Sequence, residues 1–315
     1  MPDYLHDHKE FKELLRAAEH EKRIDSSLVE KDYWIMHVLY GLQQDGFEFE
    51  LKGGTSLSKG HGIIHRFSED IDIRIDPPAK MDVKIGKNHI KPQHCESRRK
   101  YYDWLAENIK IDGIDKVIRD TEFDDDRYRS GGIRLFYKDA SPQKSGLKEG
   151  ILLEVGFDNV TPNSPLTISS WALDFALERG MDVIDNKAQD VKCYHPGYTF
   201  VEKLQTVTKK FRQFEETGNL SSNFIRHYYD IACLLDVKTV QDFIGTKEYL
   251  DHKDHRFRGA DREIPVPEQE AFQLKNAETR KQFEKEYKKT SALYYQGQIS
   301  LNEIMDKISK YLDKL

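Results

Sequence analysis

The pattern of hydrophobic and polar positions changes abruptly after residue 52. Residues 47–52 alternate apolar and charged side chains, and the alternation stops at Gly53-Gly54. A period of two predicts a β-strand, and paired glycines predict a tight turn. We therefore expect a strand that turns into a helix over a glycine step.

A second alternation covers residues 70–76. Its three isoleucines point to one face of the expected strand, and its charged residues point to the other. Asp70 and Asp72 therefore stand side by side on one face.

A third stretch, residues 151–157, is almost entirely apolar and predicts a buried strand. Glu154 is its one charged residue, and a carboxylate among apolar residues is costly unless it is paired or bound to a metal. Two explanations stay open. Either Glu154 points to solvent from an edge strand, or its strand lies beside that of Asp70 and Asp72 and adds a third carboxylate.

Helical periodicity accounts for most of the remaining chain. Residues 165–180 fit either a strand or a helix, and residues 77–91 are expected to form a loop. The expected helices cover 7–22, 26–44, 93–110, 198–216, 221–236, 269–294 and 299–315, and further short strands cover 115–120 and 133–137. The sequence thus predicts an α+β protein, with a small mixed sheet and flanking helices in residues 1–185 and a helical domain in residues 186–315.

The composition describes a very soluble globular protein, with 33% charged and 38% hydrophobic residues. A net charge of −6 excludes a bulk nucleic-acid binder, so any contact with nucleic acid must be local. Basic stretches at 98–100 and 209–212 and a basic loop at 250–263 are candidates for such contacts, although charge clusters can equally be solvated faces.

The chain has no apolar run that approaches the ~20 residues of a membrane span. Its N-terminus also lacks the basic-then-apolar plan of a signal peptide, so we expect a cytoplasmic location. Three widely spaced cysteines argue against a disulfide scaffold and against a cysteine-based zinc site.

The glycine step and the acidic strand together suit phosphoryl chemistry. Glycine lets the main chain approach an anion, and the start of a helix carries a partial positive charge. Adjacent carboxylates offer hard oxygen ligands to a divalent metal, which relieves their repulsion. Mg²⁺ or Mn²⁺ is therefore the expected ion at Asp70 and Asp72. The alternative is an ordinary glycine turn beside a wet, acidic edge strand.

Four segments, in this order, resemble motifs of the nucleotidyltransferase-like toxins of the abortive-infection type, the AbiEii family of type IV toxin–antitoxin systems. That family belongs to the DNA polymerase β-like nucleotidyltransferase superfamily. The segments are Glu-Lys-Asp-Tyr-Trp at 30–34, Lys-Gly-Gly-Thr-Ser-Leu at 52–57 followed by Arg-Phe-Ser-Glu-Asp-Ile-Asp-Ile at 66–73, Tyr-Thr-Phe-Val-Glu-Lys-Leu at 198–204, and Arg-His-Tyr-Tyr-Asp-Ile at 226–231.

The resemblance implies a nucleotidyltransferase core with Asp70, Asp72 and Glu154 as catalytic metal ligands. Glu154 would help to bind the metal or would deprotonate the acceptor. The nucleotide phosphates would lie against the residues of the glycine step, namely Gly53, Gly54, Thr55 and Ser56. Which of the two hydroxyls contacts phosphate stays open.

In the helical domain the resemblance implies that Lys203 holds nucleotide phosphates and that Asp230 sits in the active site. Asp230 would orient Lys203 or act as a second base. The alternative is a Lys203–Asp230 salt bridge that fixes helix packing, and both can be true. We expect the first two helices of this domain to lean over the active face of the sheet. Lys31 and Asp32 are either a helix-surface pair or lie near the substrate.

By resemblance, the protein is a toxin of a toxin–antitoxin or phage-defence system. It would transfer a nucleoside monophosphate from an NTP to the 3′ end of a tRNA, and an antitoxin encoded beside it is the expected partner. Two other possibilities stay open: transfer to a protein hydroxyl, and a non-catalytic member that binds nucleotide or protein.

Overall fold

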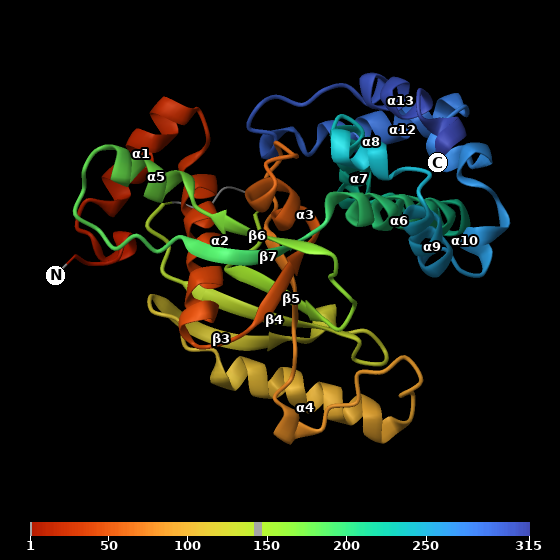
Figure 1. Ribbon diagram of the computed structural model, residues 1–315. Helices are drawn as coiled ribbons and strands as arrows, with labels where there is room; N and C mark the ends of the chain where they lie inside the picture. Colours follow the sequence, from red (N-terminus) through yellow and green to blue (C-terminus); the bar gives the residue numbers. More distant parts are fainter. Residues whose placement is uncertain (1, 142–146) are drawn as a thin grey trace. The chain divides into compact units, whose positions relative to one another are not determined.

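The computed structural model describes residues 2–141 and 147–315, which divide into two compact units (Figure 1). The sheet unit holds the residues up to His61 together with Ser68–Tyr194. The helical unit holds Gly62–Phe67 together with His195–Leu315. The chain therefore passes between the units three times. A mixed sheet combined with many helices confirms the predicted α+β class.

The sheet unit is built on one seven-stranded mixed sheet with the order β3-β4-β5-β2-β1-β7-β6. Strand β2 runs antiparallel to β1 and parallel to β5, and β1 runs parallel to β7. The other neighbouring pairs are antiparallel. The strands are β1 (Phe49–Lys52), β2 (Asp70–Ile75), β3 (Ile114–Asp120), β4 (Ser130–Tyr137), β5 (Ile151–Gly156), β6 (Asn163–Ile168) and β7 (Ala188–Tyr194).

Helices cover the apolar face of this sheet. Trp34 of α2 stacks on Tyr137 at 4.6 Å between ring centroids, and Tyr102 of α4 lies against Gly131. Residues 131 and 137 of β4 are an even number apart, so both helices contact the same face. The helices are α1 (Phe11–Lys22), α2 (Ser26–Gln44), α3 (Gly53–Thr55), the π-helical η2 (Ser56–Gly60), α4 (Pro92–Asn108) and α5 (Trp171–Glu178), with 3₁₀ turns at Leu5–Asp7, Ala79–Met81 and Thr121–Phe123.

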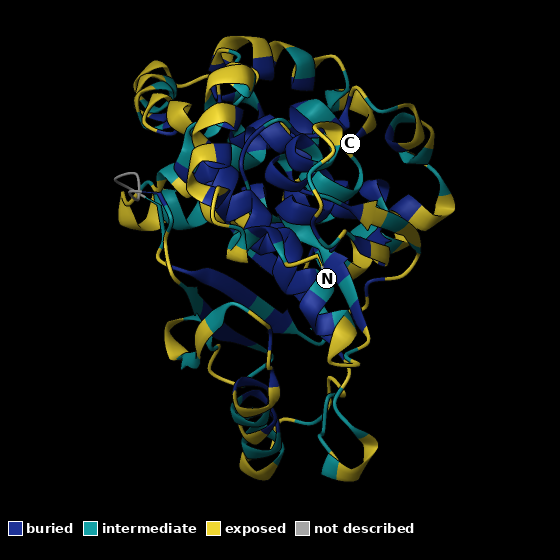
Figure 2. Ribbon diagram, turned by 90° about the vertical axis from the view of Figure 1, so that its left-hand side faces the viewer, coloured by how far each residue is buried: buried dark blue, intermediate teal, exposed yellow. Residues whose placement is uncertain are grey.

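Helix α2 is the central helix of the sheet unit. Asp25 caps it by accepting the Ser27 N–H at 3.0 Å. Most of its residues are buried, as in the dark-blue interior of Figure 2. Burial alternates strictly along β2. The acidic side of β2 therefore belongs to the opposite, more open face of the sheet.

The helical unit begins with α6, which starts at Pro196 and ends before Gly218. His195 caps its start by accepting the Gly197 N–H, and Gly218 ends it in the left-handed region at φ 71°. The helices are α6 (Pro196–Thr217), α7 (Ser222–Leu234), α8 (Lys238–Phe243), α9 (Lys247–Arg256), α10 (Ala260–Glu263), α11 (Glu270–Gln273), α12 (Ala277–Lys288) and α13 (Leu301–Ser309), with 3₁₀ turns at Val266–Glu268, Ser291–Leu293 and Leu312–Lys314.

Residues 62–67 are joined to the C-terminal part of the helical unit by hydrogen bonds. The Phe67 N–H donates to the Leu293 carbonyl at 2.8 Å, and the Tyr295 hydroxyl donates to the Ile64 carbonyl at 3.1 Å. The short segment between the glycine turn and the acidic strand is thus a structural part of the helical unit.

Several sequence predictions of individual elements were wrong. The first helix starts at Phe11, and strand β7 was not predicted. The supposed loop at 250–263 is mainly helical, in α9 and α10. The single helix expected at 269–294 is broken after α11, where Leu274 takes φ +43° and Asn276 caps α12. The ambiguous stretch 165–180 contains the end of β6 followed by α5.

Candidate active site

The structure brings Asp70, Asp72 and Glu154 together on one face of the sheet. Strands β2 and β5 are parallel neighbours, and Asp72 lies directly opposite Glu154 in the register. Strand β5 is flanked by β4 and β2, so the edge-strand explanation of Glu154 is wrong. The prediction that its strand lies beside that of Asp70 and Asp72 is confirmed.

The glycine turn touches these carboxylates directly. Gly53 has φ +72°, and a Cβ atom built on it would lie 1.9 Å from Asp72 Oδ2. Only glycine therefore lets the Asp72 carboxylate reach this position. The Thr55 hydroxyl donates to the Asp70 carbonyl at 2.5 Å, which ties the first turn after the glycines to β2. Gly54, Thr55 and Ser56 are buried in that turn.

Charge repulsion is strong at this face. Burial, and after it the charges of Asp72 and Asp70, raises the pKa of Glu154 to about 8. Lys148 and Lys52 act in the opposite direction without cancelling the effect. The Lys148 ammonium lies 2.7 Å from Asp70 Oδ2. Burial, together with the charges of Asp72 and Asp70, thus favours the protonated form of Glu154 near neutral pH.

The donor set fits a divalent metal that is shared with a substrate. Asp70 Oδ1 is buried and accepts no hydrogen bond from the residues that the structure describes. Within the same described part of the chain, only His6, Asp7 and Asp112 place three ligand atoms within 4.8 Å of one another. The three sheet carboxylates are therefore no closed cage. Mg²⁺ is commonly held by one or two carboxylates plus substrate phosphates, and this open arrangement suits that mode.

The His6 group gives weak support for a metal site. His6 Nδ1 lies 2.8 Å from the Tyr33 hydroxyl, and the other two members, Asp7 and Asp112, are exposed. Exposed acidic groups commonly lie together without a metal.

Replacing Glu154 by glutamine is expected to stabilise the metal-free protein at alkaline pH. Because the native pKa of Glu154 lies near 8 and its ordinary value is 4.5, the native state binds more protons between these pH values. Wild-type stability therefore falls as pH rises through this window, and Glu154→Gln removes that loss, by about 1–3 kcal/mol at pH 8. Urea unfolding in EDTA at pH 5 and pH 8 measures it. The exposed Glu107→Gln on α4 is the control, and an equal pH slope in wild type and Glu154→Gln would contradict this expectation.

Gly53→Ala is expected to displace the Asp72 carboxylate. The added methyl group overlaps Asp72 Oδ2, and a shift of about 1 Å at a catalytic group can cost about a hundredfold in rate. Gly46→Ala is a matched control because Gly46 has φ +79° and nothing lies within 4 Å of its built Cβ. Gly46→Ala therefore has only the cost of placing alanine at a positive φ, without a side-chain overlap. Transfer activity and unfolding of both variants separate the two effects, and equal activities would show that the contact with Asp72 is unimportant.

A second cluster lies inside the helical unit. Asp230 of α7 is fully buried, and Lys203 of α6 reaches its Oδ2 at 2.8 Å. Arg66 binds the same carboxylate through two hydrogen bonds of 2.7 Å each. The Lys203 ammonium also lies 3.3 Å from Nδ1 of His227. The predicted Lys203–Asp230 salt bridge is confirmed.

The protonation of Asp230 follows from these contacts. Burial by itself raises its pKa, but the charges of Arg66 and Lys203 outweigh burial and hold the pKa well below its usual range. Both oxygens are occupied by cations, so Asp230 is suited to orient Lys203 and is a poor proton acceptor. Of the two roles implied for Asp230, the geometry favours the first.

Sequence reasoning missed Arg66 as a partner of this cluster. Arg66 was part of the quoted motif, but its partner is 164 residues away in the sequence. Two features of the sequence could have indicated this ion pair. Arg66 comes just before the acidic strand, and Asp230 lies next to the apolar stripe of an amphipathic helix. The structure places the predicted site residues in two groups, Asp70, Asp72 and Glu154 in the sheet unit and Lys203 and Asp230 in the helical unit.

Lys31 and Asp32 are not a helix-surface pair, because both are buried. Lys31 Nζ lies 3.4 Å from Glu69 Oε2, next to the acidic strand. Asp32 accepts the Trp171 N–H at 2.8 Å and pairs with Lys59 at 2.7 Å. The motif on α2 therefore holds segments that border the carboxylates and the glycine turn.

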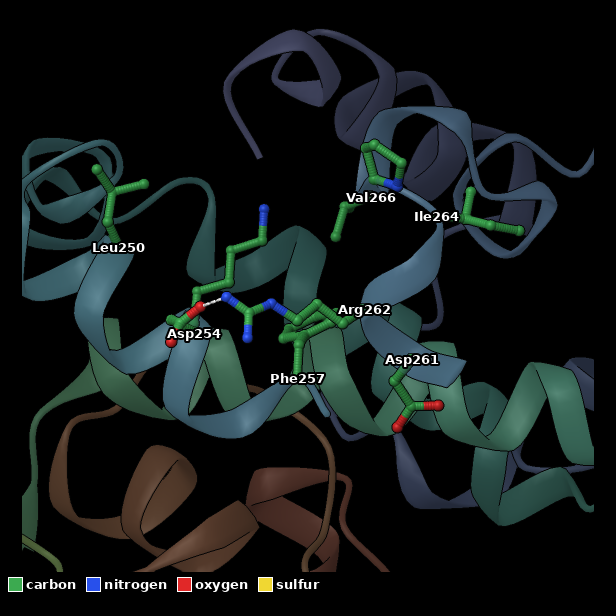
Figure 3. A pocket seen from close by; sticks show the side chains of 9 residues that line it. Leu250, Asp254, Phe257, Asp261, Arg262, Ile264 and Val266 are labelled. Atoms are coloured by element: carbon green, nitrogen blue, oxygen red, sulfur yellow. Dashed lines mark hydrogen bonds and ion pairs between the residues drawn. The ribbon is translucent and has the colours of Figure 1, made fainter. Parts of the chain in front are cut away.

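The helical unit contains a cavity of about 220 Å³ (Figure 3). It is lined by apolar side chains such as Phe257 and Val266 and by the Arg262–Asp254 ion pair, drawn as a dashed line. The predicted catalytic residues are not among those that line it. The pairing of Arg262 also weakens the case for residues 250–263 as a free basic patch.

Comparison with known proteins gives the following. The model of the family described as "Nucleotidyl transferase AbiEii toxin, Type IV TA system" matches residues 37–311. This span includes the glycine turn, the three carboxylates and the Lys203–Asp230 pair, whereas Lys31 and Asp32 precede it. No curated protein matches the chain. No helix among the described residues is both long and apolar enough to cross a membrane.

Proposed function

Because the chain belongs to the AbiEii family of nucleotidyl transferase toxins of type IV toxin–antitoxin systems, we propose that it transfers a nucleoside monophosphate from an NTP to the 3′ end of a tRNA. A toxin of this family implies a cognate antitoxin. The observation that carries the proposal is the position of Asp72, which lies opposite Glu154 in the sheet and packs on Gly53 of the turn.

The sheet unit supplies the groups for the chemical step. Asp70 and Asp72 would hold Mg²⁺, which when bound neutralises phosphate charge. The acceptor oxygen forms a bond to the α-phosphorus, the bond from that phosphorus to the bridging oxygen breaks, and pyrophosphate leaves. Glu154 would take the proton of the acceptor hydroxyl, since a cation held by Asp70 and Asp72 would favour the carboxylate form of Glu154. A base with an elevated pKa is well matched to this task near neutral pH.

Phosphate binding would use the backbone N–H groups after Gly53 and the Ser56 hydroxyl. The Thr55 hydroxyl already donates to the Asp70 carbonyl, and the Ser56 hydroxyl is buried beside the Cys193 thiol, so the backbone N–H groups are the main part of this proposed contact. Lys203 would bind the triphosphate, oriented by Asp230. The position of Arg66 supports this role of Lys203. Arg66 binds Asp230, the partner of Lys203, and precedes Asp70 by only four positions in the sequence.

The proposed acceptor of the nucleotide is a tRNA. A tRNA fits local basic segments such as residues 209–212 better than duplex DNA does, and the reaction would then take place in the cytoplasm. Transfer to a protein hydroxyl would use the same residues. A non-catalytic member would have no need of three carboxylates held together on one face of the sheet.

The test is incubation of the protein with each labelled NTP, Mg²⁺, total tRNA and cell protein. Label in tRNA that disappears with Asp72→Ala is the expected result. Label in protein that depends on Asp72 would replace the proposed acceptor by a protein hydroxyl. No Asp72-dependent label with Mg²⁺ or Mn²⁺ would overturn the proposed reaction and leave a binding protein.

A further inference from the structure

Lys148 pairs with one of the carboxylates of the sheet face. Its Nζ lies 2.7 Å from Asp70 Oδ2, and its ammonium also sits 5.4 Å from the centre of the Phe123 ring. The side chain is 31% exposed, so part of it is in contact with solvent. It occupies one oxygen of a residue that the proposed function assigns to the metal.

The backbone of Lys148 is held by two buried side chains. Its N–H donates to Glu69 Oε2 at 2.9 Å, and its carbonyl accepts from Lys31 Nζ. Lys31 and Glu69 are themselves paired at 3.4 Å, with side chains only 3% and 8% exposed. This buried pair is anchored in α2 and immediately before Asp70. It sets the distance between the main chain of Lys148 and the carboxylate.

Glu30 extends the same attachment. Its two carboxylate oxygens accept the N–H groups of Ala140 and Ser141 at 2.7 and 2.8 Å. Consecutive residues of α2, Glu30 and Lys31, therefore hold residues 140, 141 and 148. Residues 130–135 of β4 and 151–156 of β5 are already joined by their own pairing, so this buried framework is not needed to hold the two strands together. The framework instead places Lys148 beside Asp70.

We infer that Lys148 is a further substrate-binding residue, which covers Asp70 in the free protein and transfers its ammonium to the nucleotide phosphates when metal and nucleotide bind. This inference rests on the proposed function. An ammonium and a divalent cation repel each other and compete for Asp70, so Lys148 weakens binding of metal alone. Phosphates bring negative charge that accommodates both cations. Lys148 thus makes metal binding depend on nucleotide, and Lys31 and Glu69 are its positioning residues.

A merely structural ion pair predicts a different outcome. A half-exposed pair of this kind contributes little to stability, and its loss would weaken or leave unchanged both metal and nucleotide binding. The inference instead requires effects of opposite sign on the two ligands. Lys148→Met separates these cases, because methionine keeps an apolar stem of similar length over Phe123 and removes the charge.

The experiment measures Mn²⁺ binding by electron paramagnetic resonance, and then binding of a non-hydrolysable NTP analogue at saturating Mn²⁺. Full-length wild type is compared with Lys148→Met, Lys148→Arg and Asp70→Asn. Lys116→Met is the control for net charge, because Lys116 of β3 likewise lies over an aromatic ring, that of Phe136 on β4. Lys148→Met is expected to bind Mn²⁺ alone roughly tenfold or more tightly than wild type and the analogue roughly tenfold more weakly. Lys148→Arg is expected to stay close to wild type for Mn²⁺ alone.

Three results would overturn the inference. Unchanged Mn²⁺ affinity in Lys148→Met, with wild-type Mn²⁺ binding that is lost in Asp70→Asn, would reject the role of Lys148 and leave the proposed metal site standing. Mn²⁺ and nucleotide affinities that change in the same direction would also reject it. Absence of any Asp70-dependent Mn²⁺ binding would overturn both the inference and the metal site of the proposed function.

Discussion

Asp72→Asn is expected to lower nucleotidyl transfer at least about a thousandfold, because a metal ligand is worth several kcal/mol in transition-state stabilisation and about 4 kcal/mol corresponds to this factor. The amide has the same shape as the carboxylate, so the contact with Gly53 is preserved. Removing the charge also removes one cause of the raised Glu154 pKa. The metal-free variant should therefore be as stable as wild type or more stable, while its activity is lost.

The measurement is the initial rate of label transfer at saturating NTP, together with urea unfolding in EDTA. Asp76→Asn is the matched control, since Asp76 follows directly after β2 and pairs with Arg74 at 2.9 Å. It should keep wild-type activity. Equal rates for Asp72→Asn and wild type would remove Asp72 from the catalytic site.

Arg66→Met is expected to destabilise the helical unit by about 3–5 kcal/mol, the usual cost of breaking a buried ion pair by removing one partner. Asp230 is fully buried and would keep only Lys203 as a close cationic partner. Lys203 would then lose its fixed position, so nucleotide affinity should fall as well. Denaturant unfolding followed by near-ultraviolet circular dichroism measures the stability change, and analogue binding measures the second effect.

Two further variants test whether the effect of Arg66→Met comes from its buried ion pair. Arg212→Met breaks the Arg212–Asp261 pair in the same unit, but Arg212 is 38% exposed, so a loss of only about 0–1 kcal/mol is expected. Adding Asp230→Asn to Arg66→Met should recover part of the stability, because the uncompensated buried charge disappears. A destabilisation by Arg66→Met no larger than that of Arg212→Met would contradict the importance of this pair.

The same cluster sets a pH dependence with a definite sign. Because the pKa of Asp230 is depressed in the folded protein, its contribution to stability is fully present above the ordinary carboxyl pKa. That contribution is lost as pH falls below this value. The Glu154 effect runs in the opposite direction, since its raised pKa lowers stability as pH rises toward 8. The two variants Arg66→Met and Glu154→Gln therefore change opposite ends of the pH–stability curve.

Local patterns predicted the elements that carry the site. The alternation in residues 70–76 and the glycines at 53 and 54 specify a strand and a turn through contacts between near neighbours, and both were found. Errors arose where long-range packing decides the structure. The basic residues of 250–263 suggested a loop, yet the chain there forms α9, where Thr246 caps the helix by accepting the Tyr249 N–H. Lys31 and Asp32 looked like surface residues because their buried partners lie far away in the sequence.

The sequence by itself determined which residues form strands and helices around the site, which carboxylates share a face of β2, and that Glu154 needed a partner. Side-chain periodicity and glycine conformation are short-range properties, so they can be read from neighbouring residues. Only the tertiary structure decided that β5 lies beside β2, that Lys148 covers Asp70 and that Arg66 binds Asp230. These contacts join residues 78 to 164 positions apart or depend on strand order, and no local pattern specifies which distant charge will meet which.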